Sequence, residues 1–190
     1  MLQKILTAFL FLATVTGGFA QECGIIYVSP TGATSGETGT KDNPAEFQYA
    51  FSLVDPANNH LRVAHGVYEL TEPLEIPSDI VIEGGFEEGS WYKTNADTTI
   101  LHRDNGNYDA VNRALVAVKA ENQSNFRFQD VTIKVDDAPS NGVSIYGMYI
   151  SGCSDYYVSR CVIFTGDGSD GLPGTPGQQG LPGANGLDGE

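Results

Sequence analysis

The residues of this chain that could carry out catalysis are few and scattered. The segment DNGNYD holds two neighbouring acids, Asp104 and Asp109, and paired carboxylates are the groups with which glycoside hydrolases donate and accept protons. The segment also has a faint similarity to a calcium-binding loop, but it lacks the glycine at the sixth position and the distal glutamate of a hand-type site. A polar turn therefore explains these two acids better than a catalytic pair or a calcium site does.

The histidines and the neighbouring aromatic residues give no stronger signal. His60, His65 and His102 do not have the spacing of a metal-binding motif. Trp91 and Tyr92 could form a platform for stacking sugar rings, although burial against the rest of the fold is the commoner role of such side chains. We therefore predict no catalytic residues, no metal ligands and no cofactor, and we leave the binding residues unassigned.

Short β-strands would have to position all of these residues. A first strand is expected at Gly24–Val28, followed by a loop rich in Gly, Ser and Thr. From His60 onward the chain consists of short runs of β-branched and aromatic residues separated by Gly, Pro, Asn and Asp, which is typical of strands. The clearest runs are Leu61–Ala64, Val67–Leu70, Leu74–Ile76, Ile80–Ile82, Thr99–Leu101, Leu115–Ala120, Phe126–Val135, Val143–Ile150 and Tyr156–Phe164.

One helix is predicted, at about residues 44–54. Asn43 would cap this helix and Pro44 would take its first position, and Asp55 and Pro56 end the pattern. Its apolar residues recur at spacings of three and four, which places them on one helical face; they are Phe47, Ala50, Phe51 and Val54. We expect this amphipathic helix to cover the open end of the core, where it would hide a strand edge that could recruit other chains.

The strands recur as a repeat. Residues 116–133 align with residues 146–163 at an offset of 30 without a gap. The apolar residues Val116, Val118, Ala120, Phe126, Phe128, Val131 and Ile133 align with Tyr146, Met148, Ile150, Tyr156, Val158, Cys161 and Ile163, and Ser124-Asn125 aligns with Ser154-Asp155. A looser copy begins at Ser78-Asp79, at an offset of 46. The larger offset is explained if residues 87–97 are an insertion.

Stacked coils are the arrangement that this repeat favours. One unit cannot bury its apolar face alone, whereas stacked units can, with each strand paired in parallel about 4.8 Å from its counterpart. We therefore predict an all-β fold, a parallel β-helix with the short helix as its N-terminal cap. The alternative is an antiparallel β-sandwich, which the repeat and the helix make less favourable. The register of the β-helix also predicts an ion pair between Asp130 and Arg160 on neighbouring coils.

The same alignment bears on the cysteines. The chain has three, Cys23, Cys153 and Cys161, which do not make a disulfide framework. Cys161 takes the place of inward-pointing Val131, so it should be a buried thiol that packs as a small apolar residue. Cys153 lies eight positions before it in mostly extended chain, whereas a disulfide needs alpha carbons within about 7 Å. We expect all three thiols to be unbonded.

The two ends of the chain differ from the repeat. Residues 1–20 are typical of a signal peptide, with Lys4, an apolar run over residues 5–15 and small residues before a cleavage site after Ala20. At the other end, residues 168–190 have glycine at every third position, which is the pattern of a collagen triple helix. The sequence stops within a triplet, so we expect it to be truncated and its tail to be collagen-like or disordered.

The charge of the chain limits its partners. The formal net charge is −14, and it becomes −15 when removal of the signal peptide takes away Lys4. Such an acidic chain should repel nucleic acids and anionic lipids, and no apolar segment after residue 20 is long enough to span a membrane. The partners that we expect are polysaccharides, the extracellular matrix or the cell surface. Trimerisation is expected only with a longer Gly-X-Y tract, because seven complete triplets with few prolines should not hold a triple helix alone.

Residues 23–166 resemble the secreted right-handed parallel β-helix proteins of the pectate-lyase-like fold, especially bacterial surface proteins of unassigned activity. The segments that carry the resemblance are IIYVSPTG, NPAEFQYAF, HGVYELTEPLEIPSDIVIEGGF, FRFQDVTIKV and YYVSRCVIF. The resemblance implies that the coils are right-handed. Similar chains often have a Gly-X-Y tract attached to the β-helix or inserted in it.

The resemblance also implies what an active site would need. Lyases of this fold combine aspartates that hold calcium with a basic residue that abstracts a proton, all on one outer sheet. At the offset of 30, however, Asp130 stacks on a basic residue, and Asp136 and Asp137 align with Gly166 and Asp167 at the end of the coils. No row of stacked acids beside a base is therefore predicted.

We expect a signal peptide at residues 1–20, a β-helix domain at residues 21–167 and a collagen-like segment at residues 168–190. This organisation favours a non-catalytic, secreted structural or adhesive protein of the extracellular space or the cell surface. Two alternatives stay open: a polysaccharide lyase or glycoside hydrolase whose site lies in coils missing from this sequence, and a carbohydrate-binding module without turnover.

Overall fold

Three parallel β-sheets form the body of the protein in a computed structural model, which describes residues 22, 24–36, 38–94, 96–183 and 186. The strands are β1 (Ile25–Ala33), β2 (His60–Ala64), β3 (Gly66–Leu70), β4 (Leu74–Glu75), β5 (Val81–Phe86), β6 (Thr99–Arg103), β7 (Ala114–Glu121), β8 (Arg127–Gln129), β9 (Thr132–Val135), β10 (Ser144–Ser151), β11 (Tyr157–Ser159) and β12 (Val162–Thr165). The sheet orders are β1-β2-β5-β8-β11, β3-β6-β9-β12 and β4-β7-β10.

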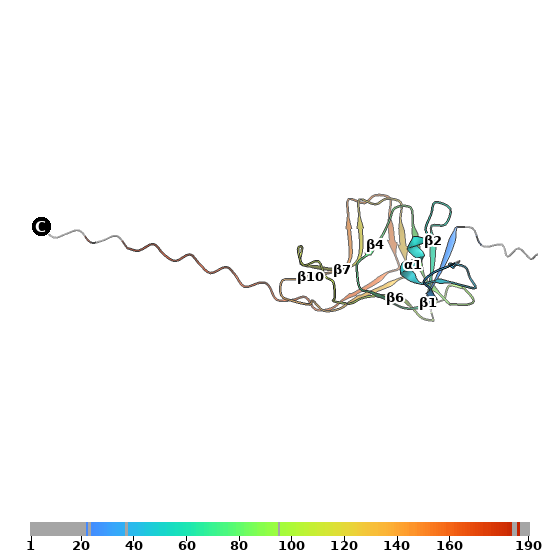
Figure 1. The fold of residues 1–190 in the computed structure, drawn as a ribbon, viewed down its shortest axis with the longest axis horizontal. Coiled ribbons are helices and arrows are strands. Elements are labelled where there is room, and N and C mark those ends of the chain that lie inside the picture. Colours follow the sequence, from blue (N-terminus) through green and yellow to red (C-terminus); the bar gives the residue numbers. More distant parts are fainter. Residues whose placement is uncertain (1–21, 23, 37, 95, 184–185, 187–190) are drawn as a thin grey trace, which may run out of the picture.

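Each complete coil gives one strand to each sheet in the same sequence, as in β5, β6 and β7 followed by β8, β9 and β10. All the paired strands in these sheets run parallel. This arrangement is a β-solenoid, seen with its stacked strands in Figure 1. The predicted parallel β-helix is therefore confirmed, and the antiparallel sandwich is wrong.

The register agrees with the repeat found in the sequence. Residue 116 pairs with residue 146, Phe128 with Val158, and Ile133 with Ile163, all at the offset of 30. The looser copy also holds, because Ile82 pairs with Phe128. The predicted insertion at residues 87–97 lies between β5 and β6. The alignment by residue type thus identified the true neighbours across coils.

The polar corners of successive coils stack on one another. Asp79, Asn125 and Asp155 have φ angles of 61°, 55° and 52°, a left-handed conformation that Asn and Asp adopt more readily than most other residues. The side-chain amide of Asn125 donates to Asp79 Oδ1 at 2.7 Å, which joins two successive corners. The Ser-Asn and Ser-Asp pairs seen in the sequence therefore mark the tight turns between neighbouring sheets.

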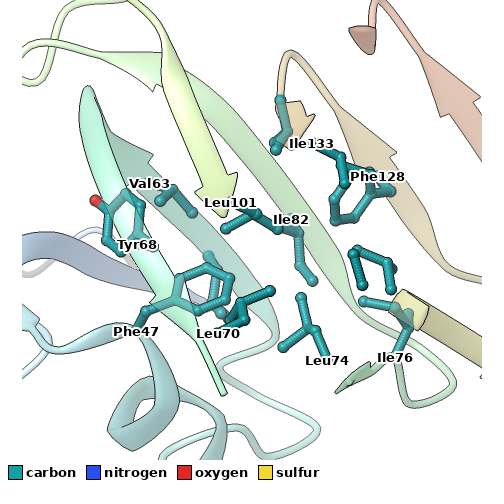
Figure 2. Packing of buried hydrophobic residues seen from close by; sticks show 14 of the residues in the cluster. Phe47, Val63, Tyr68, Leu70, Leu74, Ile76, Ile82, Leu101, Phe128 and Ile133 are labelled. Carbon is teal, nitrogen blue, oxygen red and sulfur yellow. The ribbon is translucent and has the colours of Figure 1, made fainter. Parts of the chain in front are cut away.

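The core lies inside the coils and is continuous from the helix to the last complete turn. Figure 2 shows parts of two inward rows, Ile82 beside Phe128 and Leu101 beside Ile133. Each of these side chains is at most 2 % exposed. A stack of one inward residue per coil is what parallel, in-register strands impose, because equivalent side chains then lie one strand spacing apart.

The helix α1 (Phe47–Ser52) is shorter than the predicted 44–54, and Asn43 and Pro44 do not start it. Glu46 is the N-cap, and its side chain accepts a hydrogen bond from the backbone N–H of Tyr49 at 2.9 Å. The reason is that Ala45 forms backbone bridges with β1, which keeps the residues before Glu46 extended. This close approach requires glycine at position 32, where a Cβ would lie 2.1 Å from the Ala45 carbonyl.

The covering role predicted for α1 is nevertheless correct. Phe47 and Ala50 are buried, and Phe51 and Val54 pack against the core from partly buried positions. The Phe47 and Tyr68 rings lie 5.1 Å apart (Figure 2).

The alternation of apolar residues in β7 and β10 differs from a simple period of two. Ala117 and Val118 are both buried although they are adjacent, so the residues before and after this pair face outward at positions 116 and 119. In β10, Gly147 and Met148 take the same places, and Tyr146 and Tyr149 face outward. A simple alternation would place Tyr146 on the same face as Met148 and Ile150. The structure instead places Tyr146 on the opposite face.

The insertion folds back over the outer face of the β1-β2-β5 sheet. Trp91 is 4 % exposed and its ring centroid lies 4.6 Å from that of Tyr27. Its indole N–H donates to the carbonyl oxygen of Lys41 at 3.1 Å. Trp91 thus has the packing role that burial statistics favoured, whereas Tyr92 is 75 % exposed.

The start of the Gly-X-Y segment is held by the solenoid. The Ala138 and Gly142 N–H groups donate to the carbonyl oxygens of Asp167 and Asp170, at 3.0 and 2.7 Å. The Val143 N–H donates to Ser169 Oγ at 2.9 Å. Beyond residue 170 the described chain has no strand partner and runs away from the solenoid (Figure 1).

The predicted signal peptide at residues 1–20 and Cys23 lie outside the described residues. Cys153 and Cys161 are free thiols, as predicted. Cys161 is only partly buried, because no further coil covers it among the described residues, but burial still raises the pKa of its thiol. None of the helices that the structure describes is long and apolar enough to cross a membrane.

Candidate functional site

The carboxylates of the two acids in DNGNYD accept hydrogen bonds from residues of the turns in which they lie. Asp104 Oδ1 accepts hydrogen bonds from Arg103 Nη1 at 2.9 Å and from the Gly106 N–H at 3.0 Å. Asp109 Oδ1 accepts from the N–H groups of Val111 and Asn112, both at 2.9 Å. The hydrogen bond from the Asn112 backbone is the main reason why the pKa of Asp109 lies below its usual range. Both acids therefore have the turn role that the sequence favoured.

The ion pair predicted between coils is present. Arg160 Nε and Nη2 donate to the two carboxylate oxygens of Asp130 at 2.5 and 2.6 Å. Lys93 reaches the same carboxylate from the insertion and also contacts Glu83 at 2.5 Å. Burial raises the pKa of Asp130, but the hydrogen bonds from Arg160 and Lys93 outweigh it and leave that pKa below its ordinary value.

This cluster should stabilise the fold only slightly. In a double-mutant cycle with Asp130→Asn and Arg160→Gln, we expect a coupling free energy below about 1 kcal/mol, because the Arg160 side chain is 61 % exposed and solvent screens the pair. Denaturant unfolding of the four proteins measures it. A coupling several times larger would contradict a screened surface pair.

A second polar row crosses the outer face of the β3-β6-β9 sheet. His102 Nδ1 lies 2.6 Å from Glu69 Oε2, and His102 Nε2 lies 2.9 Å from Asp136 Oδ1. Sequence alignment missed this row because its members are 33 and 34 residues apart rather than 30. The hydrogen bond with Asp136, followed by that with Glu69, raises the pKa of His102 above its ordinary value despite some desolvation.

His102 should therefore lose its proton at a higher pH than His60, because burial lowers the pKa of His60. Since the folded-state pKa of His102 is raised, its protonation stabilises the fold below about pH 6.5, and this stabilisation is lost as the pH rises through the folded-state pKa. NMR titration of the ring protons measures both values. We expect Asp136→Asn to lower the pKa of His102 and to leave His60 unchanged. A His102 pKa at or below that of His60 would contradict the observed contacts.

The remaining histidine has no such partners. His65 Nε2 is buried and forms no hydrogen bond within the described part of the chain. Over the same residues, no group of three or more His, Cys, Asp or Glu side chains is arranged to hold a metal ion.

A buried arginine, Arg103, anchors the base of the loop at residues 104–113. The Arg103 side chain is fully buried. Its guanidinium donates to the carbonyl oxygens of Asp104, Asn107 and Val116 at 2.7, 3.0 and 3.2 Å. Paired backbone hydrogen bonds between Asp109 and Ala114 then close the tip of the loop. The loop is thus a fixed wall beside the outer face of β7.

A hollow of about 280 Å³ lies between this loop and the outward side chains of β7 and β10. We name it the tyrosine hollow; its polar and aromatic lining is Asp109, Asn112, Lys119, Glu121, Tyr146 and Tyr149. Lys119 Nζ lies 2.7 Å from Glu121 Oε2 and 3.7 Å from Glu75 Oε1. The hydrogen bond with Glu121 raises the pKa of Lys119. Charged groups, amides and aromatic faces therefore converge on one depression.

Comparison of the chain with models of protein families, with curated proteins and with solved structures found no match.

Proposed function

We propose that this chain is a non-catalytic extracellular protein that serves a structural or adhesive role at a cell surface or in a matrix. The β-solenoid presents a rigid surface, and the collagen-like Gly-X-Y segment spaces that surface from whatever holds it. The leader-like residues 1–20 support export, and the strong negative charge supports partners other than nucleic acids and anionic lipids.

The junction of the two parts is the observation that carries this proposal. The Gly-X-Y pattern begins at residue 168, yet residues 167–170 still hydrogen-bond the preceding coil at Ala138, Gly142 and Val143. Residues 167–170 are thus held against the solenoid, so the last coil sets the direction in which the segment leaves it. A fixed junction suits a protein that holds a surface in a defined orientation.

An export and retention experiment tests the proposal. The whole chain, with its leader, is expressed in a secreting host, and we expect export with cleavage after Ala20, read from the intact mass. The secreted protein is then immobilised and exposed to polysaccharides and to matrix proteins. Retention of at least one of these polymers without new reducing ends or unsaturated products is expected. Release of products in proportion to the protein, or retention of none of the polymers, would overturn the proposal.

A polysaccharide-active enzyme is the second candidate, favoured by the contacts of His102 with Glu69 and Asp136. A histidine between two carboxylates on an outer sheet is a plausible proton-transfer group. If this row were catalytic, His102→Ala would abolish any depolymerisation that the wild-type protein shows and would leave retention intact.

A further inference from the structure

We propose that the tyrosine hollow binds one sugar ring of a neutral or amino-bearing glycan and rejects uronic acid residues. This inference rests on the proposed adhesive function, for which it supplies the chemistry of the partner.

The hollow has the size for one ring. Its volume of about 280 Å³ lies just below the range of drug-sized ligand sites, which begins at about 300 Å³. The wall formed by residues 104–113 is fixed at its base by Arg103 and at its tip by the Asp109–Ala114 hydrogen bonds. A wall that is already ordered loses little entropy when a ligand binds, which favours a weakly interacting ligand such as a sugar.

Two tyrosines provide the apolar contact. Tyr146 and Tyr149 are 40 % and 37 % exposed, and their ring centroids lie 5.9 Å apart at an interplanar angle of 79°. Neither hydroxyl makes a hydrogen bond to another described residue. The rings therefore offer both a face for the C–H groups of a sugar and a free hydroxyl at its edge, the combination for which tyrosine is enriched at binding surfaces.

The two rings share one face only because β10 changes its alternation. Residues three apart on a regular strand point to opposite faces. The adjacent inward positions Gly147 and Met148 correct the phase, so Tyr146 and Tyr149 both face the hollow. Gly147 permits this packing, since a Cβ at that position would lie 2.2 Å from the Ile163 side chain.

The charged groups around the hollow determine which charge a ligand can carry. Asp109, Glu121 and the adjacent Glu75 are three carboxylates, whereas Lys119 is the single ammonium group among them and is already paired with Glu121. The local charge is therefore negative, and the net charge of the whole chain is −14. An anionic uronate would be repelled, while hydroxyls can donate to the carboxylates and a protonated amine is attracted to them.

Calorimetric titration of the secreted full chain at pH 6 and low salt tests this inference with three probes. They are a chitosan hexamer, cellohexaose and hexagalacturonate, which are cationic, neutral and anionic. We expect the chitosan hexamer to bind best, cellohexaose to bind more weakly, and hexagalacturonate to show no binding. Tight binding of hexagalacturonate, or binding of none of the three, would overturn the inference.

Variants locate the site. Tyr146→Ala and Tyr149→Ala should each weaken chitosan binding about tenfold, because each removes one aromatic contact face. Tyr157→Ala is the matched control, since Tyr157 is another exposed tyrosine but lies on β11, in the next coil and in a different sheet. Equal losses for all three variants, or a loss for Tyr157→Ala alone, would contradict this location. Circular dichroism and a thermal melt verify that each variant is folded.

The outcomes separate this inference from the proposed function. If no probe binds but the immobilised protein retains another extracellular polymer, the sugar site is wrong and the adhesive role stands. If polymers are depolymerised, the adhesive role fails. Chitosan retention that the two tyrosine variants leave unchanged would also refute the site, while leaving the adhesive role intact.

Discussion

Ile133→Ala should lower the free energy of unfolding by about 3–4 kcal/mol, whereas Ile163→Ala should lower it by about 1 kcal/mol or less. The two isoleucines are cross-strand partners in β9 and β12. Ile133 is completely buried, but Ile163 is 46 % exposed. The substitution deletes the same atoms from the same register position, so the difference in cost isolates the effect of having a coil on both sides.

The physical reason is the near one-dimensional architecture of the solenoid. Each coil is stabilised by its neighbours, and a terminal coil has one neighbour instead of two. Deleting side-chain atoms of Ile133 leaves a cavity that its neighbours cannot fill, whereas water can enter the space left at Ile163. Denaturant unfolding of both variants, with matched slopes, measures the difference. Equal losses would show that the last coil is covered and would contradict the exposure seen here.

Arg103→Met should cost about 3 kcal/mol or more, the second large effect, because the buried guanidinium satisfies three carbonyl oxygens at once. Methionine keeps much of the volume and removes every donor. Burial already lowers the pKa of Arg103, which shows that its charge is held at some cost. The loss should appear in denaturant unfolding and as faster hydrogen exchange across residues 104–113.

Arg127→Ala is the control for this prediction. Arg127 is an exposed residue of β8 that stacks over the Tyr157 ring, 5.6 Å from its centroid. Its removal should cost less than about 1 kcal/mol, as expected for an exposed cation–π contact. If Arg103→Met cost no more than Arg127→Ala, the proposed anchoring of the loop would be wrong. If the stability fell but sugar binding persisted, the loop would not be needed as a wall.

Two features of this fold, the register between coils and the polar corners, could be predicted from the sequence. In parallel stacking, equivalent residues of successive coils become direct neighbours, so similar residue types recur at the length of one coil. That is why the offset of 30 identified the pairing of Ile133 with Ile163 and the Asp130–Arg160 ion pair. The Ser-Asn and Ser-Asp corners were visible because a left-handed turn restricts the residue type at each coil.

Interactions between coils of unequal length were not visible in the same way. The Glu69–His102–Asp136 row escaped because the coil offset is 33 between Glu69 and His102, and because Asp136 lies two residues beyond Lys134, the register partner of His102. The start of α1 was predicted from the preferences of Asn43 and Pro44, but pairing of Ala45 with β1 outweighed them. Local propensity amounts to tenths of a kcal/mol up to about 1 kcal/mol per residue, so strand pairing can override it.

The sequence by itself determined the coil length, the parallel pairing of neighbouring coils, the inward rows and the polar corners, because each depends on residue types that recur at a constant offset. The tertiary structure alone decided which outward residues meet. The tyrosine hollow joins a loop at residues 104–113 to β10, and Arg103 holds that loop through carbonyl groups that are the same in every residue. Such contacts depend on backbone geometry and on one change of strand phase at residues 147–148, which no periodic pattern of side chains records.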